Sequence, residues 1–160
     1  MPFTPFHFGP GALVHAAAPK SISFLAFCGA NVLVDVEPLY FMLTGGYPLH
    51  RFFHTYVGAT VAGLLFVALF ALVRRFALPL LRILRLDDLR VRAVAIGAFA
   101  GTYSHVVLDS LMHADMRPLA PFSDDNALLR MVSVETLHAY CLIAGALGVA
   151  ALAARRYFRS

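Results

Sequence analysis

Charge is scarce in this sequence. Charged side chains make up 14% of its 160 residues and hydrophobic ones 60%, whereas soluble domains average about 25% charged and roughly 45–50% apolar residues. Tryptophan is absent, and the two cysteines, Cys28 and Cys141, lie inside apolar stretches, which argues against a disulfide framework or a cysteine zinc site. Internal repeats, a glycine-rich phosphate loop and a Ser-His-Asp spacing are also missing. The shortage of charge indicates an integral membrane protein.

Four apolar stretches are long enough to cross a membrane, which takes about 20 helical residues. They cover residues 21–43, 49–73, 91–113 and 131–154. A fifth stretch, residues 6–18, is shorter, lacks a basic start and holds His7, Pro10 and His15, which argues against a cleaved signal peptide. The predicted fold is all-α: an integral membrane helical bundle of four full transmembrane helices plus a short N-terminal half-helix. We expect a single domain over residues 1–160.

Basic residues gather on one side of the predicted membrane. Lys20 precedes the first span, and the others follow the second and the last spans: Arg74, Arg75, Arg82, Arg85, Arg90, Arg92, Arg155, Arg156 and Arg159. Because basic loops stay cytoplasmic, we expect a multi-pass protein of a bacterial-type inner (plasma) membrane with the basic loop and the C-terminus inside. The net charge of +4 is then a topology signal, and no nucleic acid partner is expected.

This topology collects most other ionisable side chains at the outer face. They are His7, Asp35, Glu37, His50, His54, His105, Asp109, His113, Glu135 and His138. An isolated charged residue in mid-membrane costs about 2.5–3.5 kcal/mol on insertion scales. Their gathering at one depth therefore predicts a shared polar cavity or an ion site. His15 falls on the other side, where we expect it to be packed or hydrogen-bonded.

The spacing of the histidines is typical of metal ligands. His50 and His54 are four residues apart, as are His105 and Asp109, and His113 extends the second row by one turn. Residues four apart share a helix face, so each pair could reach one ion. We predict these residues as ligands, although His113 could also be a partner of a ligand or an interfacial residue.

Two carboxylates, Asp35 and Glu37, precede Pro38. On a helix they point about 200° apart, so they would converge only if the helix breaks near the proline. With His7 and Asp35 included, the candidate ligands outnumber the four of a tetrahedral zinc site. Mixed imidazole and carboxylate ligands suit zinc, manganese or iron, and their number favours two ions about 3.5–4 Å apart.

Other polar residues have several possible roles. Glu37 and Asp115 could be ligands, partners of ligands or interfacial groups, and either could act as a general base if it does not bind metal. Arg51 either extends to lipid head groups or holds a substrate phosphate bidentately. Glu135 and His138 show an i,i+3 spacing that a di-iron bundle would need twice, so we expect them to be partners of ligands or to make an interhelical contact.

Several segments together resemble the YdjM-like family of membrane-bound metal-dependent hydrolases. They are "PFHFGPG", "GANVLVDVEP", "HRFFHT" and "SHVVLDSLMH", the last followed by "RPLAPFSD". The family has an early His, a Pro-Asp-x-Asp segment, a His-Arg-Gly-x-Thr-His-Ser box and a His-x-x-x-Asp before a Pro-Phe-Ser turn. The chain departs from this pattern at Val34, Glu37, Phe52 and Phe53, and its second box histidine comes one residue early. The resemblance covers the chain from the first histidine to about residue 124, and it implies a metal set of His7, Asp35, His50, His54, His105 and Asp109.

The expected function is a metal-dependent hydrolase that cleaves a phosphoester of a lipid or lipid-linked substrate at the outer leaflet. Zinc-dependent phospholipases C hold a similar collection of His and Asp in a helical bundle, which suggests this reaction by analogy. One or two divalent ions, zinc ahead of manganese or iron, would activate water. Arg51 would stabilise the phosphoryl oxygens, and Glu37 or Asp115 would be the base.

The alternative function is a non-enzymatic metal-binding or metal-transporting membrane protein. A transporter needs polar residues that continue to the cytoplasmic side of the membrane. The inner halves of two spans, "GLLFVALFALV" and "GALGVAALAA", offer none. The sequence therefore favours the hydrolase.

Overall fold

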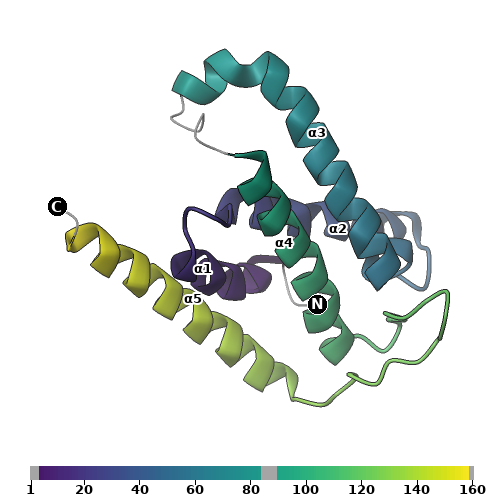
Figure 1. Cartoon of the computed structure of the whole chain (residues 1–160). Helices are drawn as coiled ribbons and strands as arrows, with labels where there is room; N and C mark the ends of the chain where they lie inside the picture. Colours follow the sequence, from purple (N-terminus) through teal and green to yellow (C-terminus); the bar gives the residue numbers. More distant parts are fainter. Residues whose placement is uncertain (1–3, 84–89, 159–160) are drawn as a thin grey trace.

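The structure, a computed structural model, describes residues 4–83 and 90–158, and the regular elements in these ranges are all helical (Figure 1). In chain order they are the 3-10 turn η1 (Thr4–His7), α1 (Phe8–Ala17), α2 (Phe24–Thr44), the 3-10 turn η2 (Phe52–His54), α3 (Tyr56–Ile83), α4 (Val91–Met112) and α5 (Val134–Tyr157).

Four of these helices, α2 to α5, are long and apolar enough to span a membrane. Their most apolar stretches have mean hydropathies of 1.4, 2.3, 1.3 and 1.9 in chain order. Helix α1 has 10 residues, which makes it about 15 Å long, half of a hydrocarbon core of about 30 Å. The predicted all-α bundle of four spanning helices and a short N-terminal helix is confirmed.

Local signals explain where several helices begin and end. The hydroxyl of Ser23 accepts a hydrogen bond from the N–H of Ala26 at 3.2 Å, and Ser133 does the same for Thr136 at 3.2 Å. Caps of this kind contribute about 1 kcal/mol each. Gly45 ends α2 with a φ of 72°, a left-handed conformation that glycine adopts without a steric penalty.

Helix α4 lies at the centre of the bundle. Half of its most apolar stretch (50%) is buried, against 22% for α3 and for α5. It packs against α2 and α3. Gly101 permits the close approach to α2, because a Cβ at this position would lie 2.6 Å from the carbonyl oxygen of Phe27. Side chains from α2 and from the start of α3 can therefore converge on α4.

Helix α5 lies mainly along α1 (Figure 1). Gly148 of α5 faces the backbone of Ala12 and Leu13 in α1, so the two helices meet almost backbone to backbone. The turn η1, just before α1, contacts α2, α4 and α5. The N-terminal segment thus joins α5 to the rest of the bundle.

Helix α3 bends in its C-terminal part (Figure 1), and Pro79 lies inside it. Proline removes a backbone hydrogen bond and commonly kinks a helix. Among the basic residues predicted to face the cytoplasm, Arg85 and Arg159 lie outside the described residues, whereas Arg155 and Arg156 occupy the last turn of α5. Their inward orientation and the bacterial inner-membrane location stay predictions.

Candidate metal centre

Four polar side chains from three elements meet inside the bundle. Asp35 comes from α2, His54 from η2, and His105 and Asp109 from α4, and one atom of each lies within 4.8 Å of the others. The Nε2 atom of His105 lies 3.2 Å from Oδ1 of Asp35 and 3.2 Å from Oδ2 of Asp109. The Nε2 atom of His54 lies 4.0 and 3.6 Å from the same two oxygens. Ligands of one tetrahedral zinc, at bond lengths of about 2.0–2.2 Å, are about 3.3–3.6 Å apart, and the observed spacings of 3.2–4.0 Å are close to that range.

Three of the four side chains are shielded from the surroundings, whereas that of Asp35 is 28% exposed. His54, His105 and Asp109 are 1%, 0% and 3% exposed. The Nε2 atoms of both histidines are buried and have no hydrogen-bond partner, although carboxylate oxygens lie at ion-pair distance. A buried polar atom without a partner costs about 1–3 kcal/mol. An ion coordinated by these nitrogens and by the carboxylates would satisfy all of them, so the donor set fits a divalent metal.

His105 is held in place by Asn31 of α2. Its Nδ1–H donates to Oδ1 of Asn31 at 3.0 Å, and Nδ2 of Asn31 donates to the carbonyl of Phe27 at 2.8 Å. Because the amide nitrogen is occupied by that carbonyl, the amide oxygen faces the ring. This arrangement fixes the proton on Nδ1 and leaves the Nε2 lone pair pointing into the cluster.

His54 is held in the same way by Glu37. Its Nδ1–H donates to Oε2 of Glu37 at 3.2 Å. The carboxylate also accepts the backbone N–H of Arg51 at 3.0 Å and that of Phe53 at 3.1 Å. One side chain of α2 thus fixes both the ring and the backbone of the segment that carries the histidine.

His50 has a third carboxylate partner, Asp115. Its Nδ1–H donates to Oδ1 of Asp115 at 2.9 Å, and the backbone N–H groups of Leu49 and His50 donate to Oδ2 at 3.0 and 3.2 Å. Burial raises the pKa of Asp115, but the hydrogen bonds from His50 and Leu49 outweigh it and hold this pKa below its ordinary value. Three histidines therefore share one pattern, with Nδ1 bound to an oxygen outside the cluster and Nε2 directed inward, as is typical of metal-binding histidines.

The predicted helix over His50 and His54 is wrong. Helix α3 begins at Tyr56, His50 lies in an irregular segment, and His54 ends the turn η2. The hydroxyl of Thr55 accepts the N–H of Gly58 at 2.9 Å and so caps α3 at a later point. The two imidazoles still meet, with ring centroids 4.7 Å apart, because the carboxylates fold the segment back.

Helix α2 does not break at Pro38, which was the condition for Asp35 and Glu37 to converge. Helix α2 continues through the proline to Thr44. Asp35 and Glu37 keep their divergent directions, and they reach opposite ring nitrogens of one residue, His54, on its Nε2 and Nδ1 sides respectively. The two carboxylates therefore contribute to one centre without converging on one point.

A second group of candidate ligands adjoins the first. His50, Asp109 and His113 also offer atoms within 4.8 Å of one another. The Nε2 atom of His50 lies 4.0 Å from Oδ2 of Asp109, and its ring stacks on that of His113 at 4.3 Å. His113 follows the end of α4, where burial lowers its pKa and favours the neutral imidazole that a metal needs. The groups share Asp109, so residues for a second ion are in place; the number of ions stays a prediction.

His7 reaches the same cluster from η1. Its Nε2 lies 3.0 Å from Oδ1 of Asp109, and its ring stacks on that of His105 at 4.4 Å. It contacts one edge of the Asp109 carboxylate while His105 and His54 face the other oxygen. The structure thus brings His7 to the centre as a partner of Asp109, and its role as a ligand stays a prediction.

Arg51 is joined to the centre through its backbone, whose N–H donates to Glu37. Its guanidinium stacks 3.5 Å from the ring centroid of Phe41, and its Nε donates to the carbonyl of Pro48 at 2.9 Å. The side chain is exposed. The guanidinium is therefore held in a fixed direction next to the residues that position His54.

The remaining polar candidates lie apart from the cluster. Glu135 is exposed at the start of α5, and the ring of His138 stacks on Phe6 at 4.4 Å. His15 is hydrogen-bonded through Nδ1 to the carbonyl of Ile22 at 2.6 Å. None of these three takes part in the two ligand groups described above.

Asn31 was missed by sequence reasoning. It is fully buried, and it stands four residues before Asp35 on α2, in the middle of an apolar span. That spacing from a predicted ligand is the signal that could have identified it. A neutral amide in a transmembrane helix usually has a hydrogen-bond partner on a neighbouring helix, and here the partner is the candidate ligand His105.

Comparisons with protein-family models, with curated proteins and with solved structures find no match to this chain. The findings for this protein are thus a helical membrane fold and a buried His/Asp cluster that could hold a metal ion. The resemblance to the YdjM-like family stays a prediction.

Proposed function

We propose that this protein is a membrane-embedded metal-dependent hydrolase whose metal is held by Asp35, His54, His105 and Asp109. The observation that carries the proposal is the pair of buried Nε2 atoms, in His54 and His105, that lack hydrogen-bond partners and lie 3.6 and 3.2 Å from Asp109. Oxygen partners on the opposite ring nitrogens support it further, since they prepare both rings to bind metal. A bound zinc, manganese or iron ion would supply the Lewis acid that activates water.

The second group of residues gives the proposal its dinuclear form. His50 and His113 would hold a second ion, and Asp109 would be shared between the two sites. His7 would orient the shared carboxylate through its 3.0 Å contact. Two-metal hydrolases use such a pair of ions to stabilise the attacking and leaving oxygens together.

The substrate class follows from the position of the centre. The cluster lies among helices that span the membrane, so a lipid or lipid-linked ester can reach it without leaving the bilayer. A phosphoester is the favoured bond, because Arg51, which precedes His54 in the same short segment, holds an exposed guanidinium against Phe41 and guanidinium groups bind phosphate bidentately. Arg51 would bind the phosphate and stabilise the charge that develops on it.

Glu37 and Asp115 take a positioning role in this proposal. Each already accepts two backbone N–H groups and one imidazole N–H. A carboxylate with its lone pairs engaged in this way is poorly placed to take a proton from water. We therefore assign both residues to the orientation of the histidines instead of to general-base catalysis.

A metal transporter fits the structure less well. Along α3 beyond Tyr56, and along α5 beyond His138, the spanning stretches hold no His, Asp or Glu. A transport path requires polar groups through the whole depth of the membrane. The hydrolase is therefore our conclusion.

The first test is metal content, measured by elemental mass spectrometry on protein purified in detergent without chelator. We expect near-stoichiometric zinc, manganese or iron in the wild type and a loss of at least about tenfold in His54→Ala and His105→Ala. His15→Ala is the matched control, since it removes a histidine that is bonded to a carbonyl away from the cluster. A wild type that binds no metal even after supplementation would overturn the proposal.

The second test is hydrolysis by the metal-loaded protein. Phospholipids and isoprenoid phosphates in nanodiscs would be screened for phosphate or head-group release, before and after chelation. We expect release that stops with chelator, returns with added metal and is lost in His105→Ala. Full metal loading with every lipid left intact would favour the non-enzymatic metal-binding alternative.

A further inference from the structure

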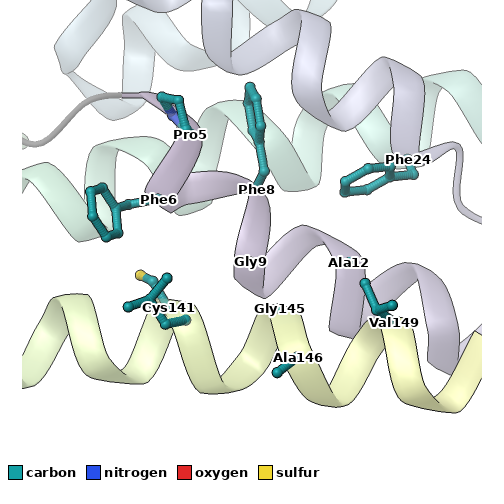
Figure 2. Close-up of a pocket in the computed structure, with 11 residues that line it drawn as sticks. Pro5, Phe6, Phe8, Gly9, Ala12, Phe24, Cys141, Gly145, Ala146 and Val149 are labelled. Atoms are coloured by element: carbon teal, nitrogen blue, oxygen red, sulfur yellow. The ribbon is translucent and has the colours of Figure 1, made fainter.

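An apolar groove runs between α1 and α5, outside the metal centre (Figure 2). Its volume is about 430 Å³, within the usual range of ligand pockets of about 300–1,000 Å³. No charged side chain lines it. Figure 2 shows Cys141 facing Phe6 at one end and Val149 beneath Ala12 at the other.

Small residues create the groove. Gly9 and Gly145 face each other, and a Cβ on Gly145 would lie 3.3 Å from the Cα of Gly9. Because these positions carry no side chains, α1 and α5 approach each other closely there, and the groove runs along this contact, flanked by the rings of Phe6 and Phe8. A wall of small residues and aromatic rings gives a narrow apolar surface with little conformational freedom.

The groove opens toward the hydrocarbon of the membrane. Leu142 and Val149 line it and are 64% and 63% exposed. Both belong to α5, a helix long and apolar enough to span a membrane. Lipid chains are therefore the molecules next to the opening.

One end of the groove adjoins the metal centre. Phe6 lines the groove, and the next residue, His7, contacts Asp109 at 3.0 Å. From that end the lining continues along α5 from Cys141 to Val149, about 12 Å at 1.5 Å per residue. A molecule with a polar end at the centre and an apolar tail would fit this path.

We propose that the groove binds one acyl chain of the lipid whose polar group lies at the metal centre. As a statement of substrate class, this inference rests on the proposed function. A helix of a second copy, about 10–12 Å across with its side chains, is too wide for a groove of this volume, whereas a single chain is not. The groove would select a lipid by the length and shape of that chain, since both the groove and the bilayer are apolar.

Photo-crosslinking tests the groove directly. Metal-loaded protein in nanodiscs would be irradiated with a phospholipid that carries a diazirine in mid-chain, and the adducts would be mapped by mass spectrometry. We expect adducts on α1 and α5 groove residues at least about fivefold above those on Leu64 and Leu65 of α3, which are 57% and 53% exposed to lipid. Equal labelling of both faces would mean ordinary boundary lipid, and groove adducts to a second copy of the chain would mean a protein interface; either result overturns the inference.

Leu142→Trp and Val149→Trp would narrow the groove. The matched control is Leu147→Trp, because Leu147 is on the same helix, is 55% exposed and does not line the groove. We expect groove labelling to fall at least about fivefold in both groove variants and to persist in the control, with metal content unchanged in all three. Unchanged groove labelling in both groove variants would overturn the inference.

Hydrolysis separates this inference from the proposed function. If both hold, the groove variants raise KM for long-chain lipid at least about tenfold but leave turnover of a soluble short-chain phosphoester unchanged. Specific groove labelling with no hydrolysis of any substrate overturns the hydrolase and leaves the chain-binding site standing. Hydrolysis with no preferential groove labelling overturns the groove alone.

Discussion

Replacement of Asn31 by leucine removes the oxygen that holds the ring of His105. The substitution keeps the branching and the number of side-chain heavy atoms at a fully buried position. It leaves the His105 Nδ1–H, which in the wild type lies 3.0 Å from the amide oxygen, without a partner. An unpaired buried donor costs about 1–3 kcal/mol. Loss of such a partner typically lowers metal affinity by about 10–100-fold, equivalent to about 1.4–2.7 kcal/mol. The two magnitudes agree, so we expect a fall in affinity within that range.

Competition with a chromophoric chelator would measure the affinity, and nitrogen NMR of the imidazoles would report the tautomer. We expect one Nδ1-protonated form of His105 in the wild type and a mixture in Asn31→Leu. Asn31→Asp keeps an acceptor and should retain most of the affinity. Thr102→Val is the control, because it removes another fully buried polar group whose hydroxyl contacts only the Phe99 carbonyl. A folded Asn31→Leu protein with wild-type affinity and a single tautomer would refute the reasoning.

Further predictions concern the same centre and its scaffold. Acidification from pH 7.5 to 5.5 should release metal, because imidazole must be neutral to bind and its ordinary pKa is about 6.5. Elemental analysis after dialysis at each pH would measure the bound metal. Full retention of metal at pH 5.5 would contradict imidazole ligation. Glu37→Gln should weaken metal binding by about tenfold, since it weakens the hydrogen-bond acceptor for His54. Unchanged metal affinity with a large loss of kcat would instead indicate that Glu37 acts as a general base. Gly101→Leu should destabilise the protein by about 1–3 kcal/mol, because its side chain would collide with the Phe27 backbone; a thermal unfolding midpoint equal to that of wild type would show that α2 and α4 can move apart.

The accuracy of the sequence predictions depended on how local each feature is. His105 and Asp109 were brought together correctly because α4 is a regular helix, where residues four apart share a face. The spacing of His50 and His54 correctly predicted that the two rings are neighbours, but the predicted helix is absent. Long-range hydrogen bonds to Glu37 and Asp115 bring the rings together instead.

Features that depend on packing were the hardest to predict from the sequence. Asn31 gains its role only because α2 lies against α4 at the depth of His105. The groove between α1 and α5 depends on glycines from two helices facing each other, and Gly9 and Gly145 are far apart in the chain. Hydrophobic length, by contrast, was enough to predict the four spans.

The positions of the centre's residues along the chain have a consequence for biosynthesis. The residues that form it and position it all occur by Asp115, and α5 supplies none of them. Helix α4 has the lowest mean hydropathy of the four spans, 1.3, and it carries two of the candidate ligands, His105 and Asp109. When the ribosome delivers α4 to the membrane, Asn31, Asp35 and His54 have already been made, so partners for its polar groups are waiting. On the proposed function, the nascent chain can therefore acquire the metal before α5 is synthesised.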